Sequence, residues 1–266
     1  MHRFFVPVDC FVGEKVTFQG EMAHQIKHVL RLRVGQVVVV LDNRGSAYDV
    51  TLETVEGPVV AGRITARRAA GGEPRAWLHL YLGLAQREKF EWMLQKCTEV
   101  GACAFTPLIT SRSLAQGREE AAKKYPRWES ILREAAEQAG RGRIPELRPP
   151  LAFKEAVQET GKLNQLSLLA WEAEHTITLK QALQGLCADP GAHPHLACFI
   201  GPEGGFAEDE VSLARTGGLV AVTLGERILR METAAVVATT LVLYEMEGDF
   251  KNNDRISKRR EENEQG

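Results

Sequence analysis

From about residue 76 to residue 248, short apolar runs of strand length alternate with longer amphipathic runs of helical period. The runs WLHLYLGLA, AFTPLIT, LSLLAWE, LACFIGPEGG and LVAVTLG have the length and apolar character of buried strands. Helical patterns occur around TLKQALQGL and AEDEVSLART, and METAAVVATTLVLYEME closes the region as a helix. Strands that alternate with helices predict an α/β domain with a largely parallel sheet.

Two helical patterns early in this region have a clear apolar face. REKFEWMLQKCTEVG ends at Gly101, and PRWESILREAAEQAG has Pro126 near its start, where proline suits the first helical turn. The residues expected to face inward are Phe90, Met93, Leu94, Cys97 and Val100 in the first helix, and Trp128, Ile131, Leu132, Ala135 and Ala139 in the second.

Residues 1 to about 72 have a different pattern, which predicts a small β-barrel. The run VVVVLD is followed by the turn NRGS and the alternating AYDVTLETV, and GPVVAGRITARR adds a turn and another strand. The segment RRAAGGEPRA, 67–76, is rich in Gly, Pro and Ala and is a candidate linker. The tail 249–266 is polar and lacks an apolar face, so we expect it to be disordered.

Composition limits the class of protein. The chain has 266 residues and a net charge of −2, so nucleic-acid binding must come from local patches rather than from total charge. It has no apolar run long enough for a membrane span, and its N-terminus is too short and mixed for a signal peptide. Five scattered cysteines without a CxxC motif favour a reducing, cytoplasmic location. In HPHLAC we expect surface histidines and a packed Cys198 rather than a zinc site.

The loop GPEGGF, 201–206, follows a predicted strand and precedes an acidic helix start. It has no lysine for a phosphate-binding P-loop, and its glycines at 201, 204 and 205 do not fit G-x-G-x-x-G. An acidic helix start would also repel a bound anion. Taken alone, the loop is equally compatible with an ordinary tight turn.

A second loop, LGERILRMETAA from Leu224 to Ala235, also ends a strand and precedes a helix. Ligands of open α/β sheets bind beyond the carboxyl ends of the strands. Two such loops without phosphate-binding residues favour a cofactor that has an adenosine but no phosphate. S-adenosylmethionine (SAM) is such a cofactor.

These motifs together resemble the RsmE-type family, the small-subunit ribosomal RNA uridine-N3 methyltransferases of the SPOUT superfamily. The resemblance rests on GPEGGF, LGERILRMETA, REKFEWMLQKCTEVG, TPLITSRS and RWESILREAAEQAGRGRIPEL, and on HRFFV and HQIKHVLRLRVGQ near the N-terminus. It implies a PUA-like RNA-binding β-barrel at 1–72, followed by a SPOUT domain at 76–248 that has a trefoil knot and forms a homodimer. It also implies methylation of a specific uridine of 16S ribosomal RNA, on assembled 30S subunits. The chain departs from the family pattern at Met231, where a smaller residue is usual.

The resemblance further implies which residues bind the cofactor. They are Glu172, Ile200, Gly201, Glu203, Gly204, Gly205, Leu224, Gly225, Ile228, Leu229 and Arg230. Apolar side chains among them can hold adenine, and the glycines let backbone groups reach its edge. Two alternatives stay open: Ile228 and Leu229 as plain core residues, and Glu172 as a solvated surface carboxylate.

The implied reaction is an in-line methyl transfer to uridine N3 without a metal. N3 is protonated at neutral pH, so the proton must be removed or the anion stabilised. We expect Arg230 to stabilise the negative charge and Glu203 or Glu232 to accept the proton. An ion pair for Arg230 and a helix-capping role for Glu232 are equally compatible with the sequence.

RNA contact is expected at local cationic groups, which would position phosphates. The candidates are Arg3, Lys27, His28, Arg31, Arg33, Arg44, Arg112, Gln138, Arg141 and Arg143. The segment HQIKHVLRLR is expected to form an amphipathic helix anchored by Ile26, Val29, Leu30 and Leu32. Two other functions share these features: an RNA-binding module without turnover, and a SPOUT enzyme that methylates tRNA or a ribose hydroxyl.

Overall fold

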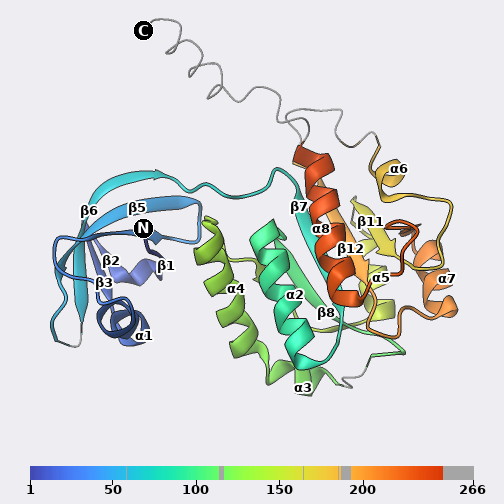
Figure 1. The fold of residues 1–266 in the computed structure, drawn as a ribbon, viewed down its shortest axis with the longest axis horizontal. Coiled ribbons are helices and arrows are strands. Elements are labelled where there is room, and N and C mark those ends of the chain that lie inside the picture. The colour runs from blue at the N-terminus through green and yellow to red at the C-terminus, as the bar shows by residue number, and fades with distance from the viewer. Residues whose placement is uncertain (58, 114–116, 164, 185, 187–192, 248–266) are drawn as a thin grey trace, which may run out of the picture. The chain divides into compact units, whose positions relative to one another are not determined.

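The computed structural model describes residues 1–57, 59–113, 117–163, 165–184, 186 and 193–247 (Figure 1). The chain forms two compact units. The first comprises Met1–Glu73, Arg87–Phe105 and Glu119–Arg148, and the second comprises Pro74–Gln86, Thr106–Arg118 and the described residues from Pro149 onward. The predicted disordered tail, 249–266, lies outside the described residues.

The first unit contains a six-stranded sheet with the strand order β1-β4-β5-β6-β3-β2. β1 (Arg3–Phe5) pairs in parallel with β4 (Val37–Leu41). The antiparallel strands are β2 (Phe11–Val12), β3 (Lys15–Phe18), β5 (Ser46–Thr54) and β6 (Val60–Ala69). The three longest strands are those that the sequence predicts, whereas β1, β2 and β3 are too short for periodicity to identify. β6 extends to Ala69, so the candidate linker is shorter than expected.

The segment between β3 and β4 differs from the predicted amphipathic helix. α1 (Gly20–His24) continues into η2 (Gln25–Val29), a π-helical turn that buries Ile26. The helix ends there, and Arg31 has a left-handed backbone with φ of +53°. Val29 is 64% exposed instead of anchoring the helix, whereas Leu30 and Leu32 pack against the core of this unit.

Two helices of the first unit confirm the predicted apolar faces. α2 (Arg87–Val100) and α4 (Tyr125–Ala139) pack together, and the rings of Phe90 and Trp128 lie 4.7 Å apart. The predicted inward residues are buried except for Val100, which is exposed, and Ala139, which is half-buried. Each is the last residue of its helix. A short helix, α3 (Arg118–Ala122), precedes α4.

The second sheet is predominantly parallel and has the strand order β10-β8-β7-β12-β11-β13, with β9 also paired to β8. This confirms the predicted α/β sheet. Its strands are β7 (Trp77–Gly83), β8 (Ala104–Ile109), β9 (Glu146–Leu147), β10 (Leu151–Ala152), β11 (Leu166–Ala170), β12 (His195–Ile200) and β13 (Val220–Val222). Cys198 is buried in β12, whereas His193 and His195 are exposed, as expected.

Helices cover both faces of the sheet in the second unit. α5 (Phe153–Thr160) and α7 (Glu208–Thr216) pack against each other and share a core with the Tyr81 and Phe199 side chains. α8 (Met231–Glu247) contacts β7 and β12 and lies across them (Figure 1). α6 (Leu179–Leu183) contacts α8 and β13. Among the described helices, none has the length and apolar character that a membrane span requires.

Candidate cofactor pocket and RNA-binding residues

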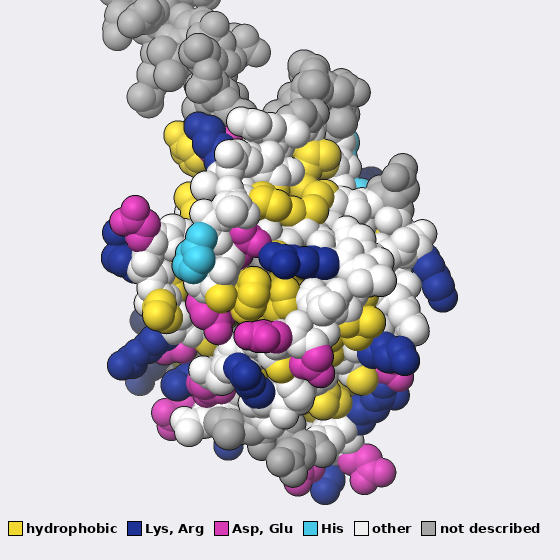
Figure 2. Space-filling model, turned by 90° about the vertical axis from the view of Figure 1, so that its right-hand side faces the viewer, with side chains coloured by type: hydrophobic (Ala, Val, Ile, Leu, Met, Phe, Trp, Pro, Cys, Tyr) yellow, Lys and Arg dark blue, Asp and Glu magenta, His cyan; other side chains and the backbone are white. Residues whose placement is uncertain are grey.

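A cavity of about 240 Å³ lies where β11, β12 and β13 end in the second unit. Its walls are the segments that follow those three strands, 170–175, 200–206 and 223–231, together with Ala234. In Figure 2, hydrophobic side chains gather in the middle of one face, with acidic, basic and histidine side chains around them. Every residue that the sequence predicts for the cofactor lines this one cavity. Sequence reasoning missed other lining residues, among them Trp171, His175 and Thr223.

The first wall is the loop GPEGGF, whose glycines allow close approach. Gly205 has φ of +67°, and its backbone N–H donates to the Pro202 carbonyl at 2.9 Å. A Cβ at Gly205 would lie 2.5 Å from a carboxylate oxygen of Glu172, and one at Gly201 would lie 3.2 Å from the Phe206 ring. The loop therefore favours glycine at 205 because of the left-handed backbone, and at 201 because the Gly205 backbone and the Phe206 ring leave little room for a Cβ.

Side chains from outside the loop hold its shape. Arg112, which follows β8, donates from Nη1 to the carbonyls of Gly204 at 2.8 Å and Phe206 at 3.4 Å. Glu210 in the acidic start of α7 accepts bonds from the backbone N–H groups of Ser111 at 2.9 Å and Ala207 at 3.0 Å. Glu210 thus caps its own helix and fastens the segment that carries Arg112.

The second wall is the segment from Thr223 to Met231. The Thr223 hydroxyl bonds to both the N–H and the carbonyl of Gly225, each at 3.1 Å, which closes a tight turn. Ile228 is 85% exposed, so the alternative that it is a plain core residue is wrong. Leu229 is half-buried and Met231 is buried.

A third segment, 171–178, joins these walls. Glu174 is buried, and hydrogen bonds from Thr176, from the Ile177 N–H and from Arg215 lower the pKa of its carboxyl to about 2. The segment also bonds to β13, because the Trp171 N–H donates to Val222 and the Thr223 N–H donates to Ile177. These bonds fix the position of the segment that places His175 in the cavity wall.

The three predicted catalytic residues are placed differently. Arg230 is exposed on the cavity wall, and within the described chain no hydrogen bond or ion pair involves its guanidinium. Glu203 is exposed and accepts a long bond, 3.4 Å, from the Gln86 N–H. Glu232 is half-buried at the start of α8 and does not line the cavity; its Oε2 is buried without a partner among the described residues.

Most of the predicted RNA contacts lie in the first unit and are accessible. His28, Arg31, Arg33, Arg44, Gln138 and Arg143 are exposed. Lys27 donates from its ammonium to the Gly57 carbonyl, and Arg3 donates to the Gly140 carbonyl at 2.8 Å. The remaining candidate, Arg112, belongs to the second unit and braces the glycine loop as described above.

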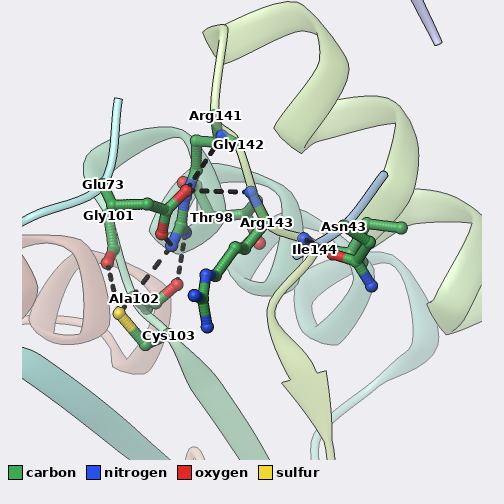
Figure 3. A network of polar contacts seen from close by, with 10 residues as sticks. All are labelled: Asn43, Glu73, Thr98, Gly101, Ala102, Cys103, Arg141, Gly142, Arg143 and Ile144. Atoms are coloured by element: carbon green, nitrogen blue, oxygen red, sulfur yellow. Dashed lines mark hydrogen bonds and ion pairs between the residues drawn. The ribbon is translucent and has the colours of Figure 1, made fainter. Parts of the chain in front are cut away.

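Arg141 is an exception, and the prediction that it contacts RNA is wrong. Its side chain is 2% exposed, and its Nη2 lies 2.6 Å from a carboxylate oxygen of Glu73 (Figure 3). Its Nη1 donates to the carbonyls of Thr98 and Ala102. The same Glu73 carboxylate accepts bonds from the N–H groups of Gly142 at 3.0 Å and Arg143 at 3.1 Å. A guanidinium enclosed by these groups has no free face for a phosphate.

Comparisons with known proteins agree with this architecture. Residues 72–243 match the RNA methyltransferase domain family, and residues 18–57 match the RNA methyltransferase PUA domain family. The ribosomal RNA small subunit methyltransferase E of Bacillus subtilis is 30% identical over 93% of this chain and 98% of that protein. The enzyme of the same name from Synechocystis is 31% identical over 89% of this chain and 75% of the relative.

Solved structures are similar over nearly the whole chain. A ribosomal RNA small subunit methyltransferase E from Neisseria gonorrhoeae, bound to SAM, has a TM-score of 0.81 with 28% identity and covers 94% of this chain and 100% of its own. A putative methyltransferase from Legionella pneumophila, also with SAM bound, has a TM-score of 0.80 with 30% identity, covering 91% and 97%. With its PUA-like first domain and parallel α/β sheet, the chain belongs to the RNA methyltransferase family that contains the ribosomal RNA small subunit methyltransferases E.

Proposed function

We propose that this protein is a SAM-dependent methyltransferase of small-subunit ribosomal RNA that methylates N3 of a uridine. The observation that carries the proposal is the cavity beyond the ends of β11, β12 and β13, because every predicted cofactor-binding residue lines it. SAM in the related structures from Neisseria gonorrhoeae and Legionella pneumophila supports the choice of cofactor.

The lining of the cavity fits SAM chemically. Ile200, Leu224 and Ile228 supply apolar surface for adenine, and the two loops offer backbone N–H and carbonyl groups for its edge. SAM carries positive charge on its sulfonium and amino groups. The carboxylates in the wall, Glu172, Glu203 and Glu226, can face that charge, and the cationic side chains among its described lining residues are Arg227 and Arg230.

When bound, SAM supplies a methyl group that a nucleophile displaces in line. This chain must then bind a uracil beside the cavity and stabilise it as its N3 proton leaves. Arg230 is the cation positioned for that role because its guanidinium is exposed at the wall without a protein partner among the described residues. Glu203 lines the cavity and is the candidate acceptor of the proton, with Glu232 as the alternative. We propose that no metal takes part.

Calorimetry with SAM followed by mass mapping of methylated nucleosides tests the proposal. We expect SAM to bind, and 3-methyluridine to form in small-subunit RNA, more efficiently on assembled 30S subunits than on naked 16S RNA. A chelator selective for transition metals, with Mg²⁺ kept in excess for the 30S subunits, should leave the rate unchanged. SAM binding without turnover would indicate an RNA-binding module, and methylated tRNA or ribose would indicate a different SPOUT activity.

Arg112 gives a prediction that separates cofactor binding from RNA binding. We expect Arg112→Ala to weaken SAM binding about tenfold, because a charged donor to two loop carbonyls is lost. Calorimetry measures this change, and Arg112→Lys should recover part of the affinity. An unchanged SAM affinity with a reduced salt dependence of RNA binding would instead make Arg112 an RNA contact.

We also propose a knotted, two-domain arrangement, with the PUA-like domain at 1–72 and the methyltransferase domain at 76–248. The family matches at 18–57 and 72–243 support these boundaries. β13 pairs with β11 instead of with β12, which precedes it in the chain, and it also bonds to the 177–179 segment. A strand that returns between earlier parts of the chain in this order is compatible with the trefoil knot that we propose.

We propose a homodimer formed through α8. The apolar side chains of Val237, Leu241 and Tyr244 are spaced along one side of this helix, and Tyr244 is 64% exposed. Leu241→Glu should therefore convert the dimer to a monomer, because a buried charge would oppose association. Light scattering after gel filtration gives the mass. Ser212→Glu, on the exposed side of α7, is the matched control; a dimeric Leu241→Glu protein would exclude this interface.

The RNA surface is proposed to include the exposed cations after η2, and a cytoplasmic location follows from a ribosomal substrate. Neutralising both Arg31 and Arg33 should weaken RNA binding and reduce the slope of log affinity against log salt by about two. Fluorescence anisotropy at several salt concentrations measures the slope. A slope equal to that of the unaltered protein would remove both residues from the interface.

A further inference from the structure

The first unit has a cavity of its own, of about 320 Å³, that the cofactor pocket does not explain. It is bounded by the N-terminal residues through β1, by η2 with the residue that follows it, and by one side of α4. The lining residues are Met1, His2, Arg3, Phe4, Gln25, Leu30, Glu134, Glu137 and Gln138. The volume lies at the lower end of the range for small-ligand pockets.

Hydrogen bonds hold the walls of this cavity together. The Phe5 N–H donates to Glu137 Oε1 at 2.8 Å, and Arg133 donates to the Phe5 carbonyl at 3.2 Å. Arg3 donates to the Gly140 carbonyl at the end of α4. Burial raises the pKa of the Glu137 carboxyl. β1 and α4, which both line the cavity, are therefore held together by three hydrogen bonds.

The polar groups of the lining suit the edge of a base better than a phosphate. The lining carries two carboxylates, Glu134 and Glu137, against one guanidinium, Arg3, and this balance disfavours a phosphate. The Gln25 and Gln138 amides can both donate and accept, and among the described residues no protein group bonds to either side chain. A carboxylate accepts hydrogen bonds from amino groups, which adenine, cytosine and guanine carry and uracil lacks.

Cations lie on the segment that forms one wall. Lys27 and His28 belong to η2, which also supplies Gln25, and Arg31 directly follows the lining residue Leu30. A strand of RNA whose phosphates contact these cations would bring its bases to the mouth of the cavity. Single-stranded RNA is read in this manner, by cations on the backbone and by side chains on the edges of splayed bases.

We propose that this cavity holds one unpaired, amino-bearing base of the substrate RNA, with Glu137 and Gln138 reading its edge. The Arg3 guanidinium, held by Gly140, offers a flat surface on which the base can stack. The inference rests on the proposed function, because it takes substrate RNA to be the ligand. It assigns base discrimination to the first unit and methyl transfer to the second.

Pentanucleotides test the proposal in the absence of SAM. UUAUU, UUCUU and UUGUU are compared with UUUUU by fluorescence anisotropy at one salt concentration. The full-length protein should bind at least one of the amino-bearing probes about tenfold more tightly than UUUUU. Equal affinity for all four probes would overturn the proposal and leave only phosphate contacts.

Glu137→Gln is the decisive variant. Its amide oxygen can still accept the bond from the Phe5 N–H, while the other carboxylate oxygen becomes an NH₂ donor. We expect the preference over UUUUU to disappear and the KM for RNA to rise about tenfold, with unchanged SAM affinity. Glu129→Gln, at an exposed position of α4 outside the cavity, is the matched control. A Glu137→Gln protein that keeps the preference would contradict the proposal.

Two further measurements remove ambiguity. Gln138→Ala, at an exposed position, provides a second test if Glu137→Gln lowers the melting temperature, and it should weaken the same preference. Methylation of small-subunit RNA is measured separately on the unaltered protein. Absence of methylation would contradict the proposed function. The preference among pentanucleotides tests the proposed base site independently of methylation.

Discussion

Arg230→Ala is expected to lower the rate of methyl transfer by about 10²–10³-fold, the usual effect of removing one preorganised charge-stabilising donor. Arg230 lines the cofactor cavity, and among the described residues it has no protein partner that its removal would leave unpaired. The loss should therefore appear in the rate constant of methyl transfer measured in a single turnover, and protein stability should stay the same. Rapid-quench measurement of 3-methyluridine formation gives the rate.

The affinity for SAM distinguishes a chemical role of Arg230 from a binding role. Calorimetry should find the SAM affinity of Arg230→Ala close to that of the unaltered protein, because the cofactor is itself cationic. Arg230→Lys keeps the charge without the planar donor and should recover part of the rate. Full methyl transfer by Arg230→Ala with normal SAM affinity would show that charge stabilisation comes from another group.

Glu73→Ala is expected to have the largest effect on stability, about 3–5 kcal/mol, because it leaves the buried Arg141 without its counter-charge. The carboxylate also accepts the N–H groups of Gly142 and Arg143, and these would lose their partner at the same time. Urea unfolding should show a large fall in the midpoint.

A double substitution tests the cause of that loss. In Glu73→Ala with Arg141→Met, the unpaired charge is gone, so part of the lost stability should return. Glu53→Ala removes a carboxylate from the exposed pair with Arg63 and should hardly move the unfolding midpoint. If Glu73→Ala behaves like Glu53→Ala, solvent must reach the Arg141 guanidinium.

Long, periodic elements of the fold were predictable because local signals agree along them. α2 combines an apolar stripe with a stop at Gly101, whose φ is +130°. α8 is a long apolar run that begins directly after the second glycine loop. β1, β2 and β3 have too few residues for a period to emerge, and pairing with distant strands defines them.

The placement of single side chains was less predictable because their partners are distant in sequence. Arg141 follows the glycine that ends α4, a position that usually faces solvent, yet its carboxylate partner is Glu73. Nothing in the local pattern marks this pair. In HQIKHVLRLR the apolar spacing suits an α-helix. A π-helical turn at Gln25–Val29 and the left-handed backbone of Arg31 interrupt the α-helical period, so the apolar residues do not share one helical face.

The candidate cofactor site was predicted by family resemblance rather than by local physical pattern. Two glycine loops indicated a ligand at strand ends, but the adjacency of β11 and β13 brings the segment 171–175 into the same cavity. His175 belongs to that segment and carries no sequence signal of its own beyond its closeness to Glu172. Only the pairing of strands reveals it.

The hydrogen bonds between the 171–178 segment and β13 have a consequence for biosynthesis. One wall of the cofactor cavity, from Thr223 to Met231, follows the other two walls in the chain, and the 171–178 segment bonds to its first residue. A nascent chain that has not yet reached Thr223 lacks this wall and cannot form the pocket. The protein should thus become competent for its cofactor only after all three wall segments, 170–175, 200–206 and 223–231, have been synthesised.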